Sequence, residues 1–183
     1  MNISIIAYSL LSFVIFYLFG RVSYKLHLVD LPNKRKIHFK PTAYTGGISL
    51  SIIFLLGIQL FDFSDKNLNL IFSMGFLISI VGLIDDKYTL NIGGKLSLQI
   101  IPILYLIIFE NFFLNEIGNY DYFALGLGSF SIPFSLLSVL FLINAFNYFD
   151  GLDGVLGFTS ITIIAILYFL IPDKDIKLFF III

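Results

Sequence analysis

The hydrophobic pattern of this chain consists of long apolar runs separated by short polar segments. Runs of this kind fit helices that cross a hydrocarbon core of about 30 Å at about 1.5 Å per residue. We predict six spans, namely Ile3–Gly20, Gly46–Phe61, Leu68–Ile84, Leu96–Phe109, about Phe123–Ile143 and Val155–Ile171. The second and fourth are short, so we expect them to extend into their flanks or to tilt less than the others. The predicted fold is an all-α, polytopic transmembrane helical bundle.

A further apolar run, Leu178–Ile183, follows a polar segment at the C-terminal end. Six residues cannot cross a membrane, and a helix broken off there would leave carbonyl groups unpaired in lipid. We interpret this run as the start of a seventh span. Residues 1–183 are then a single integral membrane domain that forms the N-terminal part of a larger domain.

The composition excludes several classes of protein and site. With 58% hydrophobic residues, 13% charged residues and a mean hydropathy of +0.99, the chain is not a soluble globular domain. The absence of cysteine excludes disulfides, thiolate metal sites and cysteine nucleophiles, and two histidines argue against zinc. A cleaved signal peptide is the weaker interpretation of the first run, because no basic residue precedes it. The net charge of −1 says little about partners, and we expect no nucleic acid.

Lysine and arginine are unevenly distributed over the predicted loops, counted in chain order. Loops one, three and five hold eight of these residues, whereas loops two, four and six hold three. The positive-inside rule therefore places loops one, three and five in the cytoplasm and the N-terminus outside. The three polar motifs described in the following paragraphs all lie in or beside these loops. They could therefore meet in a shared active site at one membrane face.

The first motif is the stretch Asn144–Gly154, which places two amides and two carboxylates between apolar runs. If the preceding helix continues through Asn144 and Asn147, these side chains share one broad face. Asp150-Gly151 and Asp153-Gly154 are turn dipeptides, whose oxygens could ligate a hard cation such as Mg²⁺. The alternative is a helix cap followed by a polar loop. We favour a functional site because so many regularly spaced oxygen donors are unusual in an apolar chain.

The second motif is the pair Asp85-Asp86 at the end of the third span, with Lys95 nine residues further along. Adjacent carboxylates repel each other and gain from a nearby cation. One could help to hold Mg²⁺ while the other orients or deprotonates a phosphate nucleophile, and the lysine could take up developing negative charge. A solvated helix end is an equally good interpretation of the pair taken alone.

The third motif is the basic loop Asp30–Pro41, followed by Gly46-Gly47. Its cations could be topology signals or contacts to anionic lipid. However, the prolines and glycines indicate a shaped loop, and basic side chains beside a carboxylate-bound metal would complete a site for a diphosphate ligand. The candidate substrate-binding residues in this loop are Asn33, Arg35, Lys36 and His38.

Together these blocks resemble the family of polyprenyl-phosphate N-acetylhexosamine-1-phosphate transferases, in the bacterial undecaprenyl-phosphate branch of glycosyl transferase family 4. The resemblance rests on Asp30–His38 with Gly46-Gly47, on Gly82–Asp86, and on Asn144–Gly154. It covers the whole chain, which looks like the N-terminal half of a family member.

The resemblance implies an enzyme that transfers a sugar-1-phosphate from a UDP-sugar to undecaprenyl phosphate and releases UMP. N-acetylglucosamine-1-phosphate is the default group, and the product would initiate cell-envelope polysaccharide such as O-antigen of lipopolysaccharide or wall teichoic acid. The implied cofactor is Mg²⁺, with Mn²⁺ as a substitute. The implied location is the bacterial inner (plasma) membrane, as a multi-pass protein with a cytoplasmic active face, and a homodimer is left open.

The resemblance also implies roles for individual residues. Asp85 and Asp86 are similar to the catalytic carboxylates and Lys95 to the phosphate-binding lysine. Asn147 is similar to a metal-ligating amide, and Asp86 is a second metal ligand. The remaining substrate-binding residues on the third block are Asn144, Asp150, Gly151 and Asp153.

Two departures from the family pattern affect these expectations. Thr89 stands where the family usually has a third carboxylate, which makes a three-aspartate metal cluster untenable at that loop. The later motifs of the family should lie beyond Ile183, so we expect residues 1–183 alone to be inactive. The alternative hypotheses are a non-catalytic truncated fragment and a membrane scaffold or transporter piece. Transporters usually carry charge near the midplane of their spans, whereas the acids here lie at span ends.

Overall fold

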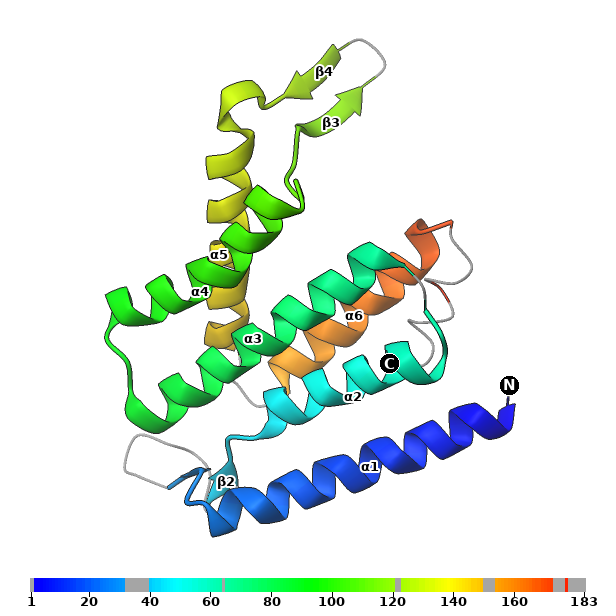
Figure 1. The fold of residues 1–183 in the computed structure, drawn as a ribbon, viewed down its shortest axis with the longest axis vertical. Coiled ribbons are helices and arrows are strands. Elements are labelled where there is room, and N and C mark those ends of the chain that lie inside the picture. The colour runs from blue at the N-terminus through cyan, green and yellow to red at the C-terminus, as the bar shows by residue number, and fades with distance from the viewer. Residues whose placement is uncertain are drawn as a thin grey trace. The chain divides into compact units, whose positions relative to one another are not determined.

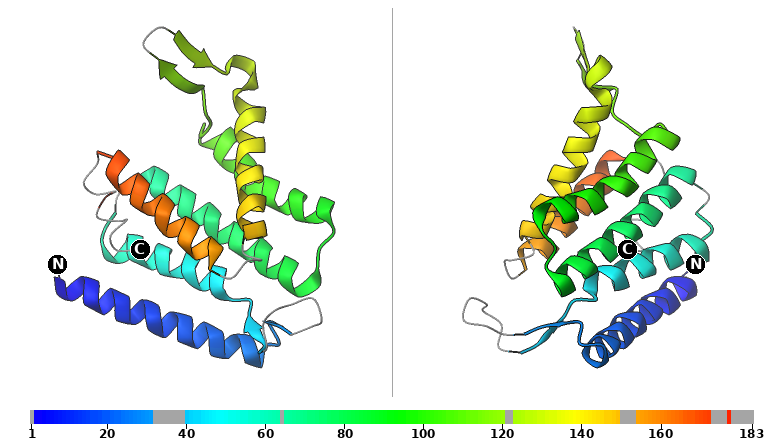
Figure 2. Two further views of the ribbon diagram at one scale, coloured as in Figure 1. Left: turned by 180° about the vertical axis from the view of Figure 1, so that it is seen from behind. Right: turned by 60° about the vertical axis from the view of Figure 1, so that its left-hand side comes forward.

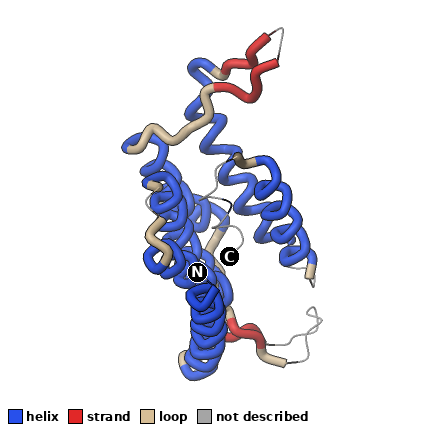
Figure 3. Tube along the Cα trace, turned by 90° about the vertical axis from the view of Figure 1, so that its right-hand side faces the viewer, coloured by secondary structure: helices blue, strands red, loops and turns tan. Residues whose placement is uncertain are grey.

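The structure is a computed structural model that describes residues 2–31, 40–63, 65–120, 123–149, 154–172 and 177. These residues form six α-helices, a short 3₁₀ helix and two small antiparallel strand pairs (Figure 1). Figure 3 colours the strands red, and they are short beside the blue helices. The predicted all-α membrane fold is therefore confirmed. The chain divides into two compact units at Lys95/Leu96, and the single-domain interpretation stays a prediction.

The first unit contains three helices that pack in chain order, so that α2 contacts both α1 and α3. Both views of Figure 2 show them side by side. A short strand pair, with Val29 opposite Ala43 and Asp30 opposite Thr42, connects α1 to α2. The elements are α1 (Asn2–Lys25), β1 (Val29–Asp30), β2 (Thr42–Ala43), α2 (Gly46–Leu60) and α3 (Lys66–Tyr88).

Close approach and small polar groups hold α1 against α2. The buried Tyr8 hydroxyl donates a hydrogen bond to the Ile53 carbonyl at 2.7 Å. Gly57 makes room for this ring, because a Cβ there would lie 2.6 Å from the Tyr8 oxygen. At the other end, the Thr45 hydroxyl donates to the Phe19 carbonyl at 3.2 Å. Contacts between small and hydroxyl-bearing residues are typical of helix pairs in membranes, where the lipid is as apolar as the side chains.

Local hydrogen bonds and backbone conformation determine where α3 begins and ends and where α4 begins. The Asp65 carboxylate accepts a hydrogen bond from the Leu68 N–H at 2.9 Å and caps α3. The helix ends where Thr89 adopts a left-handed conformation with φ of 47°. Two residues later, Asn91 accepts from the Gly94 N–H at 2.7 Å, so a short turn connects the two helices.

The second unit contains most of α4 (Ile92–Phe109), a hairpin and two further helices. The hairpin strands are β3 (Glu116–Tyr120) and β4 (Phe123–Gly126), which pair antiparallel. A 3₁₀ turn leads into α5 (Ser131–Phe149), and α6 (Val155–Leu170) packs against α5. The Ser135 hydroxyl accepts from the Leu114 N–H at 2.8 Å and so fastens the segment before the hairpin to α5.

The helices confirm most of the predicted spans and correct three boundaries. The fourth span extends N-terminally to Ile92, as expected for so short a run. The first helix continues to Lys25, so Arg21–Lys25, which we predicted to lie in the loop after the first span, are helical. The predicted start of the fifth span at Phe123 is wrong, because Phe123–Gly126 is a strand and α5 begins at Ser131. Apolar content alone does not distinguish a short strand from the first turn of a helix.

The helices fit a multi-pass membrane protein. Four helical segments within the described residues are long and apolar enough to cross a bilayer by length and composition. The remaining two helices, α2 and α6, are apolar but shorter. Many large apolar side chains on the helices are exposed, as expected for surfaces that face lipid, including Phe13, Phe141 and Phe158. The predicted seventh span lies outside the described residues.

Candidate functional site

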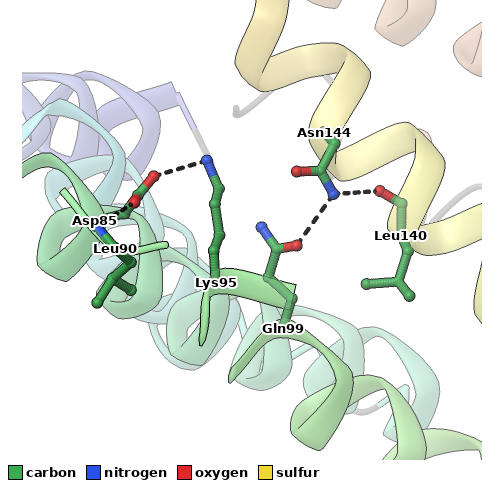
Figure 4. A network of polar contacts seen from close by, with 6 residues as sticks. All are labelled: Asp85, Leu90, Lys95, Gln99, Leu140 and Asn144. Atoms are coloured by element: carbon green, nitrogen blue, oxygen red, sulfur yellow. Dashed lines mark hydrogen bonds and ion pairs between the residues drawn. The ribbon is translucent and has the colours of Figure 1, made fainter. Parts of the chain in front are cut away.

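The polar end of α3 is organised around Asp85, which uses both carboxylate oxygens (Figure 4). Oδ1 accepts a hydrogen bond from the Leu90 N–H at 3.1 Å, and Oδ2 lies 2.7 Å from Nζ of Lys95. The two charged side chains are only 18% and 17% exposed. The Asp85 carbonyl also accepts from the Thr89 N–H at 2.7 Å. Asp85 therefore stabilises the turn after α3 and brings Lys95 to the helix end.

Asp86 differs from its neighbour in its surroundings. It is exposed, whereas Asp85 is half-buried. Consecutive residues on a helix point about 100° apart, so the two carboxylates face different directions. The structure confirms that the aspartate pair lies at the C-terminal end of α3. It shows, however, that Lys95 belongs to the first turn of α4 and not to a loop.

A second polar contact in the first unit joins Asp30 of β1 to Tyr44, the residue that follows β2. The Tyr44 hydroxyl donates to Oδ1 of Asp30 at 3.3 Å, and the Tyr44 N–H donates to the Leu28 carbonyl at 3.0 Å. Burial, followed by the negative charges of Asp30 and Asp86, raises the pKa of the Tyr44 phenol above its ordinary value. The phenol therefore remains a neutral hydrogen-bond donor at physiological pH.

The amides of the Asn144–Gly154 stretch lie on α5, which continues through Asn147 to Phe149 as expected. The Asn144 amide nitrogen donates to the Leu140 carbonyl at 2.8 Å and to Oε1 of Gln99 on α4 at 3.1 Å (Figure 4). Gln99 is 3% exposed. Asn147 lies three residues beyond Asn144, on the same broad face of the helix, and is exposed.

Several predicted site residues lie outside the described residues. They are Asn33, Arg35, Lys36 and His38 of the basic loop, and Asp150, Gly151 and Asp153 after α5. Their roles, the substrate contact of Asn144 and the meeting of the three motifs at one membrane face stay predictions.

The donor chemistry of the described residues suits a hard cation. Asp86 carries a carboxylate and Asn147 an amide, both residues are exposed, and oxygen is the donor type that Mg²⁺ prefers. Within the described part of the chain, no three histidine, aspartate or glutamate side chains gather as a ready-made metal site. A Mg²⁺ ion bound by either group would complete its coordination shell with water molecules or with oxygen atoms of a substrate.

Two residues of these contacts were missed by the sequence reasoning. Gln99 is an amide within an otherwise apolar predicted span, and that isolation was an available signal. Tyr44 gave no comparable signal, because one tyrosine before Gly46-Gly47 indicates nothing until the strand pair places it beside Asp30.

Comparison with known proteins identifies the family. The profile of glycosyl transferase family 4 matches residues 68–183, which include Asp85, Asp86, Lys95 and the Asn144–Gly154 stretch. The chain belongs to this family. No solved structure matches it significantly.

Curated relatives are enzymes of this kind. The chain is 30% identical to an undecaprenyl-phosphate alpha-N-acetylglucosaminyl 1-phosphate transferase of Escherichia coli O157:H7, over 80% of this chain and 41% of that protein. It is 29% identical to the protein of the same name from Salmonella typhi, over 78% of this chain and 39% of the relative. A probable undecaprenyl-phosphate N-acetylglucosaminyl 1-phosphate transferase of Bacillus subtilis is 30% identical over 44% of this chain and 23% of its own length. The chain thus spans about two fifths of the length of the first two glycosyl transferase family 4 relatives.

Proposed function

We propose that the protein containing this chain transfers N-acetylglucosamine-1-phosphate from UDP-N-acetylglucosamine to undecaprenyl phosphate. In this reaction a phosphate oxygen of the lipid attacks the sugar-bearing phosphorus of the donor. The bond from that phosphorus to the bridging oxygen breaks, and UMP leaves. The lipid diphosphate product would initiate a cell-envelope polysaccharide. Membership of glycosyl transferase family 4 and the names of the relatives support this assignment.

The observation that carries the proposal is the grouping of Asp85, Asp86 and Lys95 at the end of α3. The ion pair between Asp85 and Lys95 holds a cation at the same end of an apolar helix as the exposed residue Asp86. Phosphoryl transfer needs such a combination, because negative charge develops on phosphate oxygens and must be stabilised where it forms.

Each residue then has a role. Lys95 binds the diphosphate of the donor, and Asp85 holds the lysine ammonium in place until the phosphates arrive. Asp86 orients or deprotonates the attacking phosphate. The Asp86 carboxylate and the Asn147 amide would also hold the cation. When bound, Mg²⁺, or Mn²⁺ as a substitute, neutralises charge on the transferring phosphoryl group.

The residues outside the described ranges complete the proposal. Basic side chains of the Asp30–Pro41 loop, among them Arg35 and Lys36, would bind the nucleotide phosphates. Asp150 and Asp153 would contact the nucleotide side of the donor. The excess of lysine and arginine in loops one, three and five supports a cytoplasmic active face on the inner membrane.

The test is an assay of membranes from cells that express the gene encoding this chain. They are incubated with UDP-N-acetylglucosamine, undecaprenyl phosphate and Mg²⁺, and UMP and the lipid product are measured. We expect product formation that chelation of Mg²⁺ abolishes and that Asp86→Asn lowers roughly a hundredfold or more. Lys87→Gln is the matched control, because it removes a neighbouring exposed charge from the same helix end. Equal loss in both variants, or turnover without Mg²⁺, would contradict the assignment.

A further inference from the structure

Gln99 is a buried polar residue for which the proposed reaction has no use. It lies in the apolar part of α4 with 3% of its surface exposed, and its Oε1 accepts a hydrogen bond from Asn144 on α5. Within the part of the chain that the structure describes, its amide nitrogen has no partner. A buried amide inside a membrane helix is unfavourable unless it serves packing specificity or function.

The contact lies one helical turn before a proposed metal ligand. Asn144 also donates to the Leu140 carbonyl of its own helix, so its side chain is fixed at both α4 and α5. Asn147 follows on the same face, two residues before α5 ends at Phe149. The last turn of a helix lacks continuing backbone hydrogen bonds and frays readily, so a side-chain contact just before it limits that motion.

We propose that Gln99 and Asn144 form a positioning pair, which holds the last turn of α5 so that the amide of Asn147 is presented in a fixed place. Asn144 then acts through Asn147. The functional part of this inference, that the pair helps Asn147 to ligate the cation, rests on the proposed function. The structural part, that the pair limits motion of the last turn of α5, does not depend on the proposed function.

The structural part is tested with a reporter cysteine at residue 147. The 183 residues contain no cysteine, so Asn147→Cys gives a single reactive thiol once any cysteine elsewhere in the protein is replaced by serine. The rate of reaction with a water-soluble maleimide is compared in this background with Gln99→Met and with Ile103→Met. Ile103 is the matched control, because it lies one turn further along α4 and is equally buried but makes no polar contact.

We expect Gln99→Met to raise the labelling rate about threefold, which corresponds to the ~0.6 kcal/mol of a typical hydrogen bond between membrane helices. Ile103→Met should leave the rate unchanged. If Gln99→Met does not accumulate in membranes, Gln99→Leu with Asn144→Leu replaces it, since that pair leaves no buried amide unpaired. Equal labelling rates in the Gln99 and Ile103 variants would overturn the positioning role.

The functional part is tested with Asn147 intact, by the Mg²⁺ concentration that gives half-maximal UMP release. Gln99→Met should raise it about tenfold, as substitutions behind a metal ligand commonly do. Faster labelling with an unchanged Mg²⁺ requirement would show that the pair holds the helix but does not serve the metal. Faster labelling in a protein whose parent releases no UMP would instead sink the proposed function and leave the positioning role standing.

Discussion

Two side-chain contacts made by α4, of Lys95 and of Gln99, differ in charge and in surroundings. At its first turn, Lys95 forms an ion pair with Asp85, and both side chains retain some exposure. One turn further, Gln99 forms a neutral amide pair with Asn144 and is almost completely buried. Charged groups are costly in lipid, whereas a paired amide is tolerated. The comparison indicates that the chain keeps its ionic chemistry at helix ends and uses neutral polar groups inside the bundle.

The first prediction concerns the side of the membrane on which the Asp85–Lys95 ion pair lies. Cysteine labelling in intact cells should be either complete or absent at each position. A single cysteine in place of Asn33, in the predicted cytoplasmic loop, should react with an impermeant reagent only after the cells are permeabilised. A cysteine in place of Glu116, in the hairpin, should react in intact cells, because the charge bias places that segment outside. The reverse pattern would invert the topology and move the charged contact to the outer face.

The second prediction breaks the ion pair. Lys95→Met should lower UMP release about a hundredfold, because the proposed transition state loses a cation and the half-buried Asp85 loses its partner. Lys87→Met is the control, since it removes an exposed lysine only eight residues away. Membrane levels of both variants are compared by immunoblot. Similar activity in the two would mean that the ion pair only fastens the turn.

The third prediction measures a neutral contact in the first unit for comparison with the amide pair. Tyr8→Phe should lower the free energy of unfolding in detergent by about 1 kcal/mol, because the buried Ile53 carbonyl loses its donor. Tyr17→Phe, at an exposed position on the same helix, should have no comparable effect. Thermal unfolding of the purified variants gives the difference. An equal loss in both would argue that the Tyr8 hydroxyl contributes nothing specific.

The smallest effect is expected where both members of the amide pair become apolar. Gln99→Leu with Asn144→Leu should change the free energy of unfolding by ~0.6 kcal/mol or less, since no buried amide remains unsatisfied. Either single substitution should cost at least as much as the double one. A large loss in the double variant alone would show that the pair is a main source of stability, contrary to the role argued for it.

Most helices could be predicted because a long apolar run in the sequence directly indicates a membrane span. The sequence also grouped Lys95 with Asp85-Asp86 as candidate site residues, and their roles stay predictions. The structure adds an ion pair between Lys95 and Asp85, which the short turn at Thr89–Asn91 makes possible. The hairpin was missed, because Phe123–Gly126 is apolar like the helix that follows it. The Gln99–Asn144 contact was missed for another reason. The hydropathy of two spans does not say which of their faces meet.

The close approach of α1 and α2 at Gly57 has a consequence for how this protein can change in evolution. A methyl group at residue 57 would lie 2.6 Å from the Tyr8 oxygen, so the ring would have to leave the Ile53 carbonyl. Phenylalanine at residue 8 removes that oxygen and lessens the crowding, which leaves the ring carbon Cζ at 3.1 Å as the nearest atom. Residues 8 and 57 should therefore covary among orthologues, with alanine at the second position appearing mainly where the first has lost its hydroxyl.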